Sequence, residues 1–393
     1  MRVAFDVTTC AKPRRGGIAT YGWELISACA RVAPRHDYRL VLRPNRWMAR
    51  RHLRPLGVQL AEAAAAVAAS PEAAAEARAD RDPPLLLLDA FADLCLGSID
   101  VLHSIGVRLP GRGRFVKVVT LHDLNVFEFP ELSSPEWRDK RQARIRQTLA
   151  RADLVIVYSR AGAAALQHLL GFPGDRVRVV PIGVDTTHFH PVAPDGRRPV
   201  LERHDVAERP YVLHVGAYSA RKNQRGLLAA FARAALPPDW ALVLVGPTGD
   251  DAASLRIAAR ELRLDPTRLR LPGWVGGADY RALLSGAALC VCASLHEGFG
   301  IPVIEAQACG APVLCSDRGA LPETLGECGV LVDVTDEAAF AGALASLAAD
   351  APLRARLAEC GPPRVQRDFT WERVAALTLQ AYADVLALKG ATR

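Results

Sequence analysis

The sequence has no long apolar run. No 18 apolar residues occur without a charge among them, so a membrane-spanning helix is not expected. No Gly-x-Gly-x-x-Gly is present, which argues against a nicotinamide enzyme. The nine cysteines are odd in number and none form Cys-x-x-Cys, so we expect buried, reduced thiols and neither a disulfide framework nor a zinc site. The N-terminus lacks a signal-like apolar region, which favours a cytoplasmic protein or one that touches a membrane only at its surface.

Length and composition indicate a globular protein of two domains. The chain has 393 residues, of which 50% are hydrophobic and 23% charged, while aromatic residues make up only 6%. The net charge of +7 is uneven: residues 1–190 hold 27 basic and 19 acidic side chains (+8), and residues 191–393 hold 22 and 23 (−1). This asymmetry suggests that the first half faces an anionic partner. An arginine-rich composition that comes from a GC-rich genome would produce the same excess.

Short runs rich in valine, isoleucine and leucine alternate with helical patterns in both halves of the chain, which predicts parallel sheets covered by helices on both faces. We expect helices at 62–79, 85–96 and 135–151, among others, and a proline-rich linker over 181–210. The fold class is therefore α/β, with two doubly wound Rossmann-like domains whose strand ends face a cleft. We place the domains at 1–190, joined by a last helix at 371–393, and at 191–370.

The richest motif is Glu-Gly-Phe-Gly-Ile-Pro-Val-Ile-Glu, from Glu297 to Glu305, which follows a buried strand and opens a helix. Backbone N–H groups at such a helix start attract anions. The two carboxylates suit paired sugar hydroxyls, whereas they would repel a phosphate. An ordinary strand–loop–helix junction with two solvated glutamates is the alternative interpretation of the spacing alone.

This motif resembles the Glu-x7-Glu motif of the GT-B-fold retaining glycosyltransferases that use nucleotide-sugars (glycosyltransferase family 4), among them sucrose synthases and bacterial mannosyltransferases. Further similarities lie at residues 179–185, although Ile182 replaces the usual Asn, at His214–Ala217 with Arg221-Lys222-Asn223, at 316–323 and at Trp371. The similarity is dense over 179–335 and looser before it. Leu121-His122-Asp123-Leu124 resembles the mannosyltransferase branch.

The resemblance implies a role for each matching residue. Glu305 would hold the ribose of the donor, Glu297 and His122 the donor hexose, and Arg221 and Lys222 the diphosphate, where cations replace a metal ion. The donor site would also include backbone groups and small residues, namely Gly16, Gly17, Gly216, Val275, Gly298, Phe299, Gly300 and Ile301. His103 ends a neighbouring strand and is a second, less favoured histidine.

The predicted function is transfer of a hexose, with mannose favoured, from a nucleotide-diphosphate sugar to a hydroxyl of a glycan or lipid-linked acceptor, with retention of anomeric configuration. No cofactor and no nucleic-acid partner are expected. No metal is expected either, because the one Asp-x-Asp, at Asp80–Asp82, does not follow a buried strand. The basic segment 43–54, with Trp47 and Leu53, is a candidate for contact with an anionic membrane surface. The alternatives are an epimerase, a phosphorylase-like enzyme or a non-catalytic sugar-binding subunit.

Overall fold

The computed structural model describes residues 1–11, 16–43, 51–53, 55–57, 59–60, 85–87, 99–110, 112–207, 209–246 and 248–391. They fall into two compact units: Met1–Gly183 with Trp371–Arg393, and Val184–Thr370. The first break thus comes after Gly183, slightly earlier than the boundary placed after residue 190. No helix among the described residues is both long enough and apolar enough to cross a bilayer.

The first unit contains a seven-stranded sheet in the order β3-β2-β1-β4-β5-β6-β7, and every neighbouring pair is parallel. The strands are β1 (Arg2–Asp6), β2 (Asp37–Leu42), β3 (Leu85–Leu87), β4 (Val101–Ser104), β5 (Val116–Thr120), β6 (Leu154–Val157) and β7 (Val177–Val179). The order reverses between β1 and β4, which is the switch point of a doubly wound sheet and the place where such folds bind ligands.

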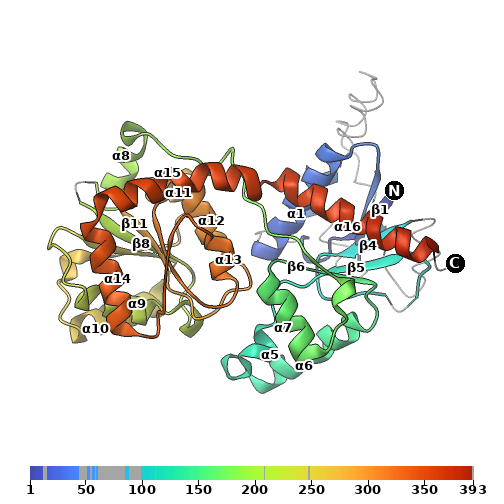
Figure 1. Cartoon of the computed structure of the whole chain (residues 1–393), viewed down its shortest axis with the longest axis horizontal. Coiled ribbons are helices and arrows are strands. Elements are labelled where there is room, and N and C mark those ends of the chain that lie inside the picture. Colours follow the sequence, from blue (N-terminus) through green and yellow to red (C-terminus); the bar gives the residue numbers. More distant parts are fainter. Residues whose placement is uncertain are drawn as a thin grey trace. The chain divides into compact units, whose positions relative to one another are not determined.

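Among the residues that the structure describes, the helices of the first unit include α1 (Gly17–Val32), α5 (Asn125–Glu128), α6 (Pro135–Leu149), α7 (Arg160–Leu170) and α16 (Trp371–Ala391). Ser159 caps α7, as its sequence position predicts, because its hydroxyl accepts a hydrogen bond from Gly162 N at 3.0 Å. The C-terminal helix α16 packs against α1 (Figure 1). The Trp371 ring lies against Gly183, where a Cβ atom would come within 2.7 Å of it, so the end of the chain is anchored on the first unit.

The second unit repeats this architecture with six parallel strands in the order β10-β9-β8-β11-β12-β13. They are β8 (Tyr211–Val215), β9 (Ala241–Val245), β10 (Leu269–Gly273), β11 (Leu289–Cys292), β12 (Val313–Ser316) and β13 (Val330–Val332). The helices are α8 (Pro194–Arg203), α9 (Gln224–Arg233), α10 (Gly249–Glu261), α11 (Gly277–Gly286), α12 (Ile301–Ala308), α13 (Leu321–Leu325), α14 (Glu337–Ala349) and α15 (Ala351–Asp368).

Alternate residues of these strands bury the two faces of the second sheet. On one face, Leu242 and Leu244 pack in a cluster with Phe231 of α9 and residues of α10 and α14. On the other face, Val243 and Val245 pack with residues of α8, α11 and α12. Strands buried on both sides need continuous apolar sequence, which explains why β9 reads Ala-Leu-Val-Leu-Val.

Two expectations for secondary structure differ from the structure, and a third lies outside the described residues. Residues 85–87 form an edge strand instead of the start of a helix, and the rest of that expected helix lies outside the described residues, as does the helix expected at 62–79. The expected linker contains α8, which packs on α11 and carries Pro199 inside it. Tertiary packing therefore outweighs the local proline signal there.

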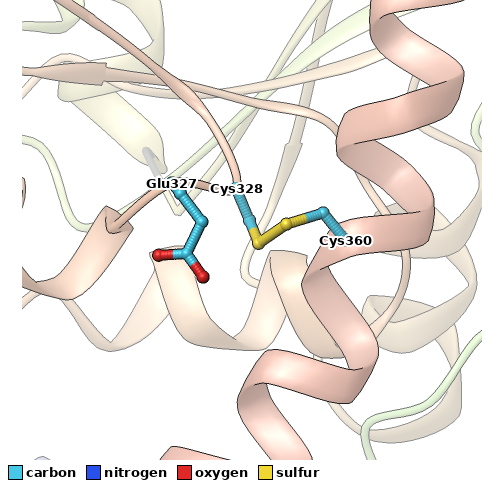
Figure 2. Close-up of side chains that lie close together, drawn as sticks. All are labelled: Glu327, Cys328 and Cys360. Atoms are coloured by element: carbon cyan, nitrogen blue, oxygen red, sulfur yellow. A yellow bond between two sulfur atoms is a disulfide. The ribbon is translucent and has the colours of Figure 1, made fainter.

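The expectation that all described cysteines are reduced is wrong for one pair. Cys328 and Cys360 form a disulfide, with Cα atoms 5.4 Å apart, that ties the loop before β13 to α15 (Figure 2). The two cysteines are separated by 32 residues, so no short spacing signals the pair. The Glu327 carboxylate lies near the two sulfurs, but both are bonded to each other and are not thiolate ligands. The other described cysteines are buried thiols outside any disulfide.

Candidate active site

The loops after β8 and β11 meet at the carboxyl edge of the second sheet. The loop after β8 holds Arg221 and Lys222 in a short 3-10 turn, and the loop after β11 holds Glu297. Two hydrogen bonds join the loops: Leu295 N donates to Arg221 O at 2.8 Å, and the Arg221 guanidinium donates to His296 O at 2.7 Å. The two cations and the carboxylate are therefore brought together by the backbone as well as by their charges.

Glu297 is the centre of this arrangement. Its Oε1 atom lies 2.8 Å from Arg221 Nη1 and 2.7 Å from Lys222 Nζ, and it accepts a hydrogen bond from Ser294 Oγ at 2.8 Å. The side chains of Glu297 and Lys222 are only 13% and 14% exposed, so solvent screens the pair weakly. Burial alone would raise the pKa of the Glu297 carboxyl, but Lys222 and Arg221 outweigh it and hold the pKa below its ordinary value.

Two positive charges thus share one negative charge, which leaves the cluster with a net charge of +1. All three contacts are made to Oε1, and no described residue hydrogen-bonds the other oxygen, Oε2. The cluster can therefore attract a phosphate through the cations while Oε2 accepts a hydroxyl hydrogen. Sequence reasoning selected all three residues but missed their mutual ion pairs and the role of Ser294.

Glu305 lies one turn inside α12 and has a different environment. The Tyr280 hydroxyl donates to Glu305 Oε2 at 2.7 Å. Burial raises the pKa of the Glu305 carboxyl to about 7, although the Tyr280 hydrogen bond and Lys222 act in the opposite direction. Among the described residues, none hydrogen-bonds to both Glu305 and Glu297. This agrees with the expectation that the two carboxylates hold separate parts of one ligand. Tyr280 was not selected from the sequence, because no motif includes it.

Glycines shape the same edge of the sheet. A Cβ atom at Gly216 would lie 3.2 Å from Lys222 Cδ and Cε, so any side chain there would displace the lysine. Gly300 caps α12 with φ +100°, a left-handed conformation that favours glycine, and a Cβ there would meet Leu321. The helix therefore starts at Ile301 with Pro302 in its first turn, as the sequence predicts in outline.

The other predicted donor-site residues of this unit have mixed positions. Gly298 is next to Glu297 in the loop after β11. Val275 follows β10, and its side chain packs against the buried cluster that contains Val243 and Val245. The Phe299 side chain is 5% exposed and stacks edge-on against Phe369, with ring centroids 5.8 Å apart. Its ring therefore belongs to the core, and its carbonyl oxygen accepts a hydrogen bond from the Thr324 hydroxyl.

His214 is a buried residue of this site to which sequence reasoning gave no role of its own. Its Nδ1 donates to Val291 O at 3.0 Å, and its Nε2 has no partner among the described residues. Burial, and then the nearby Lys222, lower the pKa of His214 to about 4. The ring is therefore neutral at pH 7 and adds no charge to the cationic pair.

His122 follows β5 in the first unit and is fixed by two hydrogen bonds. Its Nε2 donates to Ile105 O at 2.6 Å, which leaves Nδ1 to accept from the Tyr158 hydroxyl at 2.5 Å. Tyr21 packs edge-on against both rings, with centroids 5.6 and 5.2 Å away. Burial lowers the pKa of His122, so the imidazole is neutral at pH 7. The ring is rigid and oriented, as a ligand-contacting residue requires.

His103 has the surroundings of a structural residue. It is fully buried, and its two ring nitrogens lie 2.5 Å from the Tyr382 hydroxyl and 2.7 Å from Thr120 Oγ1. Burial lowers the pKa of His103 to about 3. This residue therefore joins α16 to the sheet and is not available to a substrate.

Gly16 and Gly17 open α1 directly before its exposed first turn. No heavy atom lies within 4 Å of a Cβ built at either position, and Gly16 has an ordinary φ of −92°. Neither packing nor backbone conformation requires glycine here, which agrees with space kept for a ligand. Asp80–Asp82 and most of the basic segment 43–54 lie outside the described residues.

The chain matches known proteins over most of its length. Residues 15–188 match the family described as Glycosyltransferase Family 4, and residues 209–350 match Glycosyl transferases group 1. It is 29% identical to O-antigen chain mannosyltransferase B of Escherichia coli over 287 residues, covering 72% of this chain and 74% of that protein. It is 32% identical to D-inositol 3-phosphate glycosyltransferase of Salinispora tropica over 333 residues, covering 77% of this chain and 67% of that protein.

Solved structures show the same fold. Sucrose-phosphate synthase from Thermosynechococcus elongatus matches with a TM-score of 0.69 and 25% identity, over 98% of this chain and 99% of that one. Anabaena HepE in complex with UDP and glucose matches with a TM-score of 0.70 and 19% identity, over 98% and 99%. The predicted α/β fold class and glycosyltransferase activity are confirmed. This chain belongs to the family-4 type of GT-B glycosyltransferases.

Proposed function

We propose that this glycosyltransferase moves a hexose, with mannose favoured, from a nucleotide-diphosphate sugar to a hydroxyl of a glycan or lipid-linked acceptor, with retention at the anomeric carbon. The observation that carries the proposal is the Arg221–Lys222–Glu297 cluster, which combines a diphosphate-binding pair with a hydroxyl-accepting carboxylate. A relative named as an O-antigen mannosyltransferase and a structural neighbour crystallised with UDP and glucose support the donor class.

In the proposed reaction the bond from the anomeric carbon to the diphosphate oxygen breaks, and a bond to the acceptor oxygen forms on the same face of the sugar. The acceptor hydroxyl gives its proton to the departing diphosphate. Arg221 and Lys222 stabilise the charge that develops on the leaving group, and Glu297 Oε2 accepts from a hexose hydroxyl. Glu305 accepts from the ribose, and His122 contacts the hexose from the first unit.

The alternatives receive less support from the site. An epimerase needs a tightly bound nicotinamide, and the sequence has no glycine fingerprint for one. A phosphorylase-like enzyme would need a lysine for pyridoxal phosphate, whereas Lys222 is engaged by Glu297. A non-catalytic sugar-binding subunit has no need of a cationic pair aimed at a leaving group. Purified protein without cofactor absorbance, together with release of a nucleoside diphosphate, would separate the proposal from all three.

We further propose that the reaction needs no divalent metal, because two cations supply the charge that a metal would. Activity that a chelator abolishes and magnesium or manganese restores would contradict this. We place the enzyme in the cytoplasm, peripheral at the inner membrane face, on the basis of the +8 charge of residues 1–190. Co-sedimentation with anionic but not neutral vesicles, weakened by salt, is the expected result.

A thermal-shift panel of GDP- and UDP-sugars tests the donor class. A ligand that binds only the native state raises the melting temperature, by an amount that grows with its concentration relative to Kd. We expect one nucleotide series to stabilise the protein and Arg221→Ala with Lys222→Ala to abolish that stabilisation. Stabilisation by none of these sugars at millimolar concentration would contradict the proposal.

A further inference from the structure

A cavity of about 630 Å³ lies in the first unit, beside α6 and the segments that follow β2 and β4. Nine described residues line it; none of these nine is acidic, and five are cationic: Arg43, Arg108, Lys140, Arg144 and Arg151. We call this cavity, with its five cationic residues, the cationic cavity. Its volume is in the range of small-molecule sites and exceeds what a single inorganic phosphate fills.

Three segments distant in sequence build the cationic cavity. Lys140, Arg144 and Arg151 recur at helical spacing along and just beyond α6, so they share one side of that helix. Arg43 directly follows β2, and Arg108 lies in the loop after β4. The sheet edge therefore gathers charges that no single stretch of sequence displays.

The backbone anchors two of these arginines. The Arg43 guanidinium donates to Asp6 Oδ2 at 3.1 Å and to Arg108 O at 3.2 Å. Arg151 Nη1 donates to Leu109 O at 3.0 Å. An arginine on an ordinary solvated surface has many rotamers, whereas these two are held at the cavity wall before any ligand arrives.

Local carboxylates do not neutralise the cavity. Asp6 balances Arg43, and Glu136 lies 3.9 Å from Lys140 in an exposed pair that contributes little. Arg108 and Arg144 form no ion pair with any described residue. Burial lowers the pKa of Arg108, and the positive charges of Arg144 and Arg43 lower it further, against a smaller opposite effect of Asp6. Like charges are thus held close together, and a bound anion would relieve their repulsion.

We propose that the cationic cavity binds a phosphate or diphosphate group carried by the acceptor. This inference rests on the proposed function, because it assumes that the enzyme transfers a sugar to an acceptor. The donor diphosphate is assigned to Arg221 and Lys222 in the other unit, so it does not account for these charges. A connection to the reaction exists within the first unit: Ile105, whose carbonyl holds His122, begins the loop whose residues Arg108 and Leu109 line the cavity.

The test measures binding of inorganic pyrophosphate by calorimetry. It is done in the Arg221→Ala/Lys222→Ala background, because pyrophosphate would otherwise also occupy the donor site. Adding Arg108→Gln and Arg144→Gln should weaken binding about tenfold or more, since charge-assisted hydrogen bonds to phosphate are lost. The matched control adds Arg256→Gln and Arg260→Gln on α10, which remove the same charge from an exposed surface of the second unit and should change nothing.

A second variant guards against misfolding. Lys140 is 78% exposed, so Lys140→Gln leaves the core intact and should still weaken pyrophosphate binding severalfold. Equal pyrophosphate affinity in the cavity variants and the α10 control, or no binding in the starting background, would overturn the proposal. Donor-induced thermal shifts of Arg108→Gln/Arg144→Gln in the otherwise native chain report on the proposed function separately, and we expect them to be normal.

Vesicles decide the source of the phosphate. Phosphatidylcholine vesicles with and without phosphatidic acid present the same phosphate chemistry on a lipid. If Arg108→Gln/Arg144→Gln also loses co-sedimentation with phosphatidic acid vesicles, the acceptor phosphate is borne by a lipid. If only pyrophosphate binding is lost, it is borne by a water-soluble acceptor.

Discussion

Lys222 Nζ lies 2.7 Å from Glu297 Oε1, so a cation assigned to the donor diphosphate is already paired with a carboxylate assigned to the donor sugar. Arg221 shares the same oxygen at 2.8 Å. The cluster therefore holds its cations in place at the cost of part of their attraction for a phosphate. Donor binding must redistribute these contacts, and this competition makes the roles of the three residues separable by experiment.

Removing the charge of Glu297 should affect binding and turnover in opposite directions. Glu297→Gln keeps the shape of the side chain but leaves both cations unneutralised. We expect the free nucleoside diphosphate to bind severalfold more tightly and sugar transfer to fall at least tenfold, because the hexose contact is weakened. Titration calorimetry and initial rates check the two effects. Weaker binding of the diphosphate would contradict the electrostatic account.

Glu305 should make stability depend on pH. Its pKa is about 7 in the folded chain, against an ordinary 4.5, so the folded state binds more protons than the unfolded state between these values. The stability that this group contributes is fully present below about pH 4.5 and is lost as the pH rises through 7. The loss is at most about 3 kcal/mol, because Glu305 is only half-buried. Urea unfolding at pH 5 and pH 8 measures it, and Glu305→Gln should remove that share of the difference.

The two strand-end histidines should respond differently to substitution. His122→Gln is expected to lower sugar transfer tenfold to a hundredfold with little change in melting temperature, because His122 is only partly buried and water can satisfy its two hydrogen-bond partners when the ring is replaced. His103→Gln is expected to cost about 1–3 kcal/mol of stability, because it leaves buried hydroxyls without good partners. Reversed outcomes for the two variants would contradict the assignment of His122 to the ligand.

The disulfide gives a simple thiol count. The chain has nine cysteines, so denatured protein should show nine thiols after reduction and at least two fewer when it is purified without reductant. The bond spans 32 residues, and chain-entropy arguments give it about 3–4 kcal/mol of stabilisation. Cys328→Ser should lower the free energy of unfolding by a similar amount. Nine reactive thiols under both conditions would show that the pair is reduced.

Strong local signals explain why both sheets, and the three residues that meet in the Arg221–Lys222–Glu297 cluster, could be selected from the sequence alone. Short apolar runs such as Ala-Leu-Val-Leu-Val in β9 indicate a strand that is buried on both faces of a sheet. The stretch Glu297–Glu305 combines a strand end, a capping glycine and a helix start. The pairing of Glu297 with Lys222 could not be predicted in the same way. It depends on two loops that are far apart in sequence and meet only when β8 and β11 become neighbours.

The misses have the same physical origin. Cys328 and Cys360 have no short spacing to reveal them, and Phe299 is in the core because Phe369, distant in sequence, packs on it. α8 formed despite Pro199 because it could pack on α11. The cationic cavity likewise gathers residues from three segments, whereas the sequence pointed to the stretch 43–54, whose described residues contribute Arg43 to it.

The central claim is that Arg221 and Lys222 stabilise the departing diphosphate. The most direct measurement is release of nucleoside diphosphate from the donor that the thermal-shift panel selects, with Arg256→Ala/Arg260→Ala as the charge-matched control. We predict that Arg221→Ala and Lys222→Ala each lower turnover by about thirtyfold to a thousandfold, which corresponds to roughly 2–4 kcal/mol in the barrier, while the control keeps the native rate. Turnover in both single variants equal to that of the control would contradict the account.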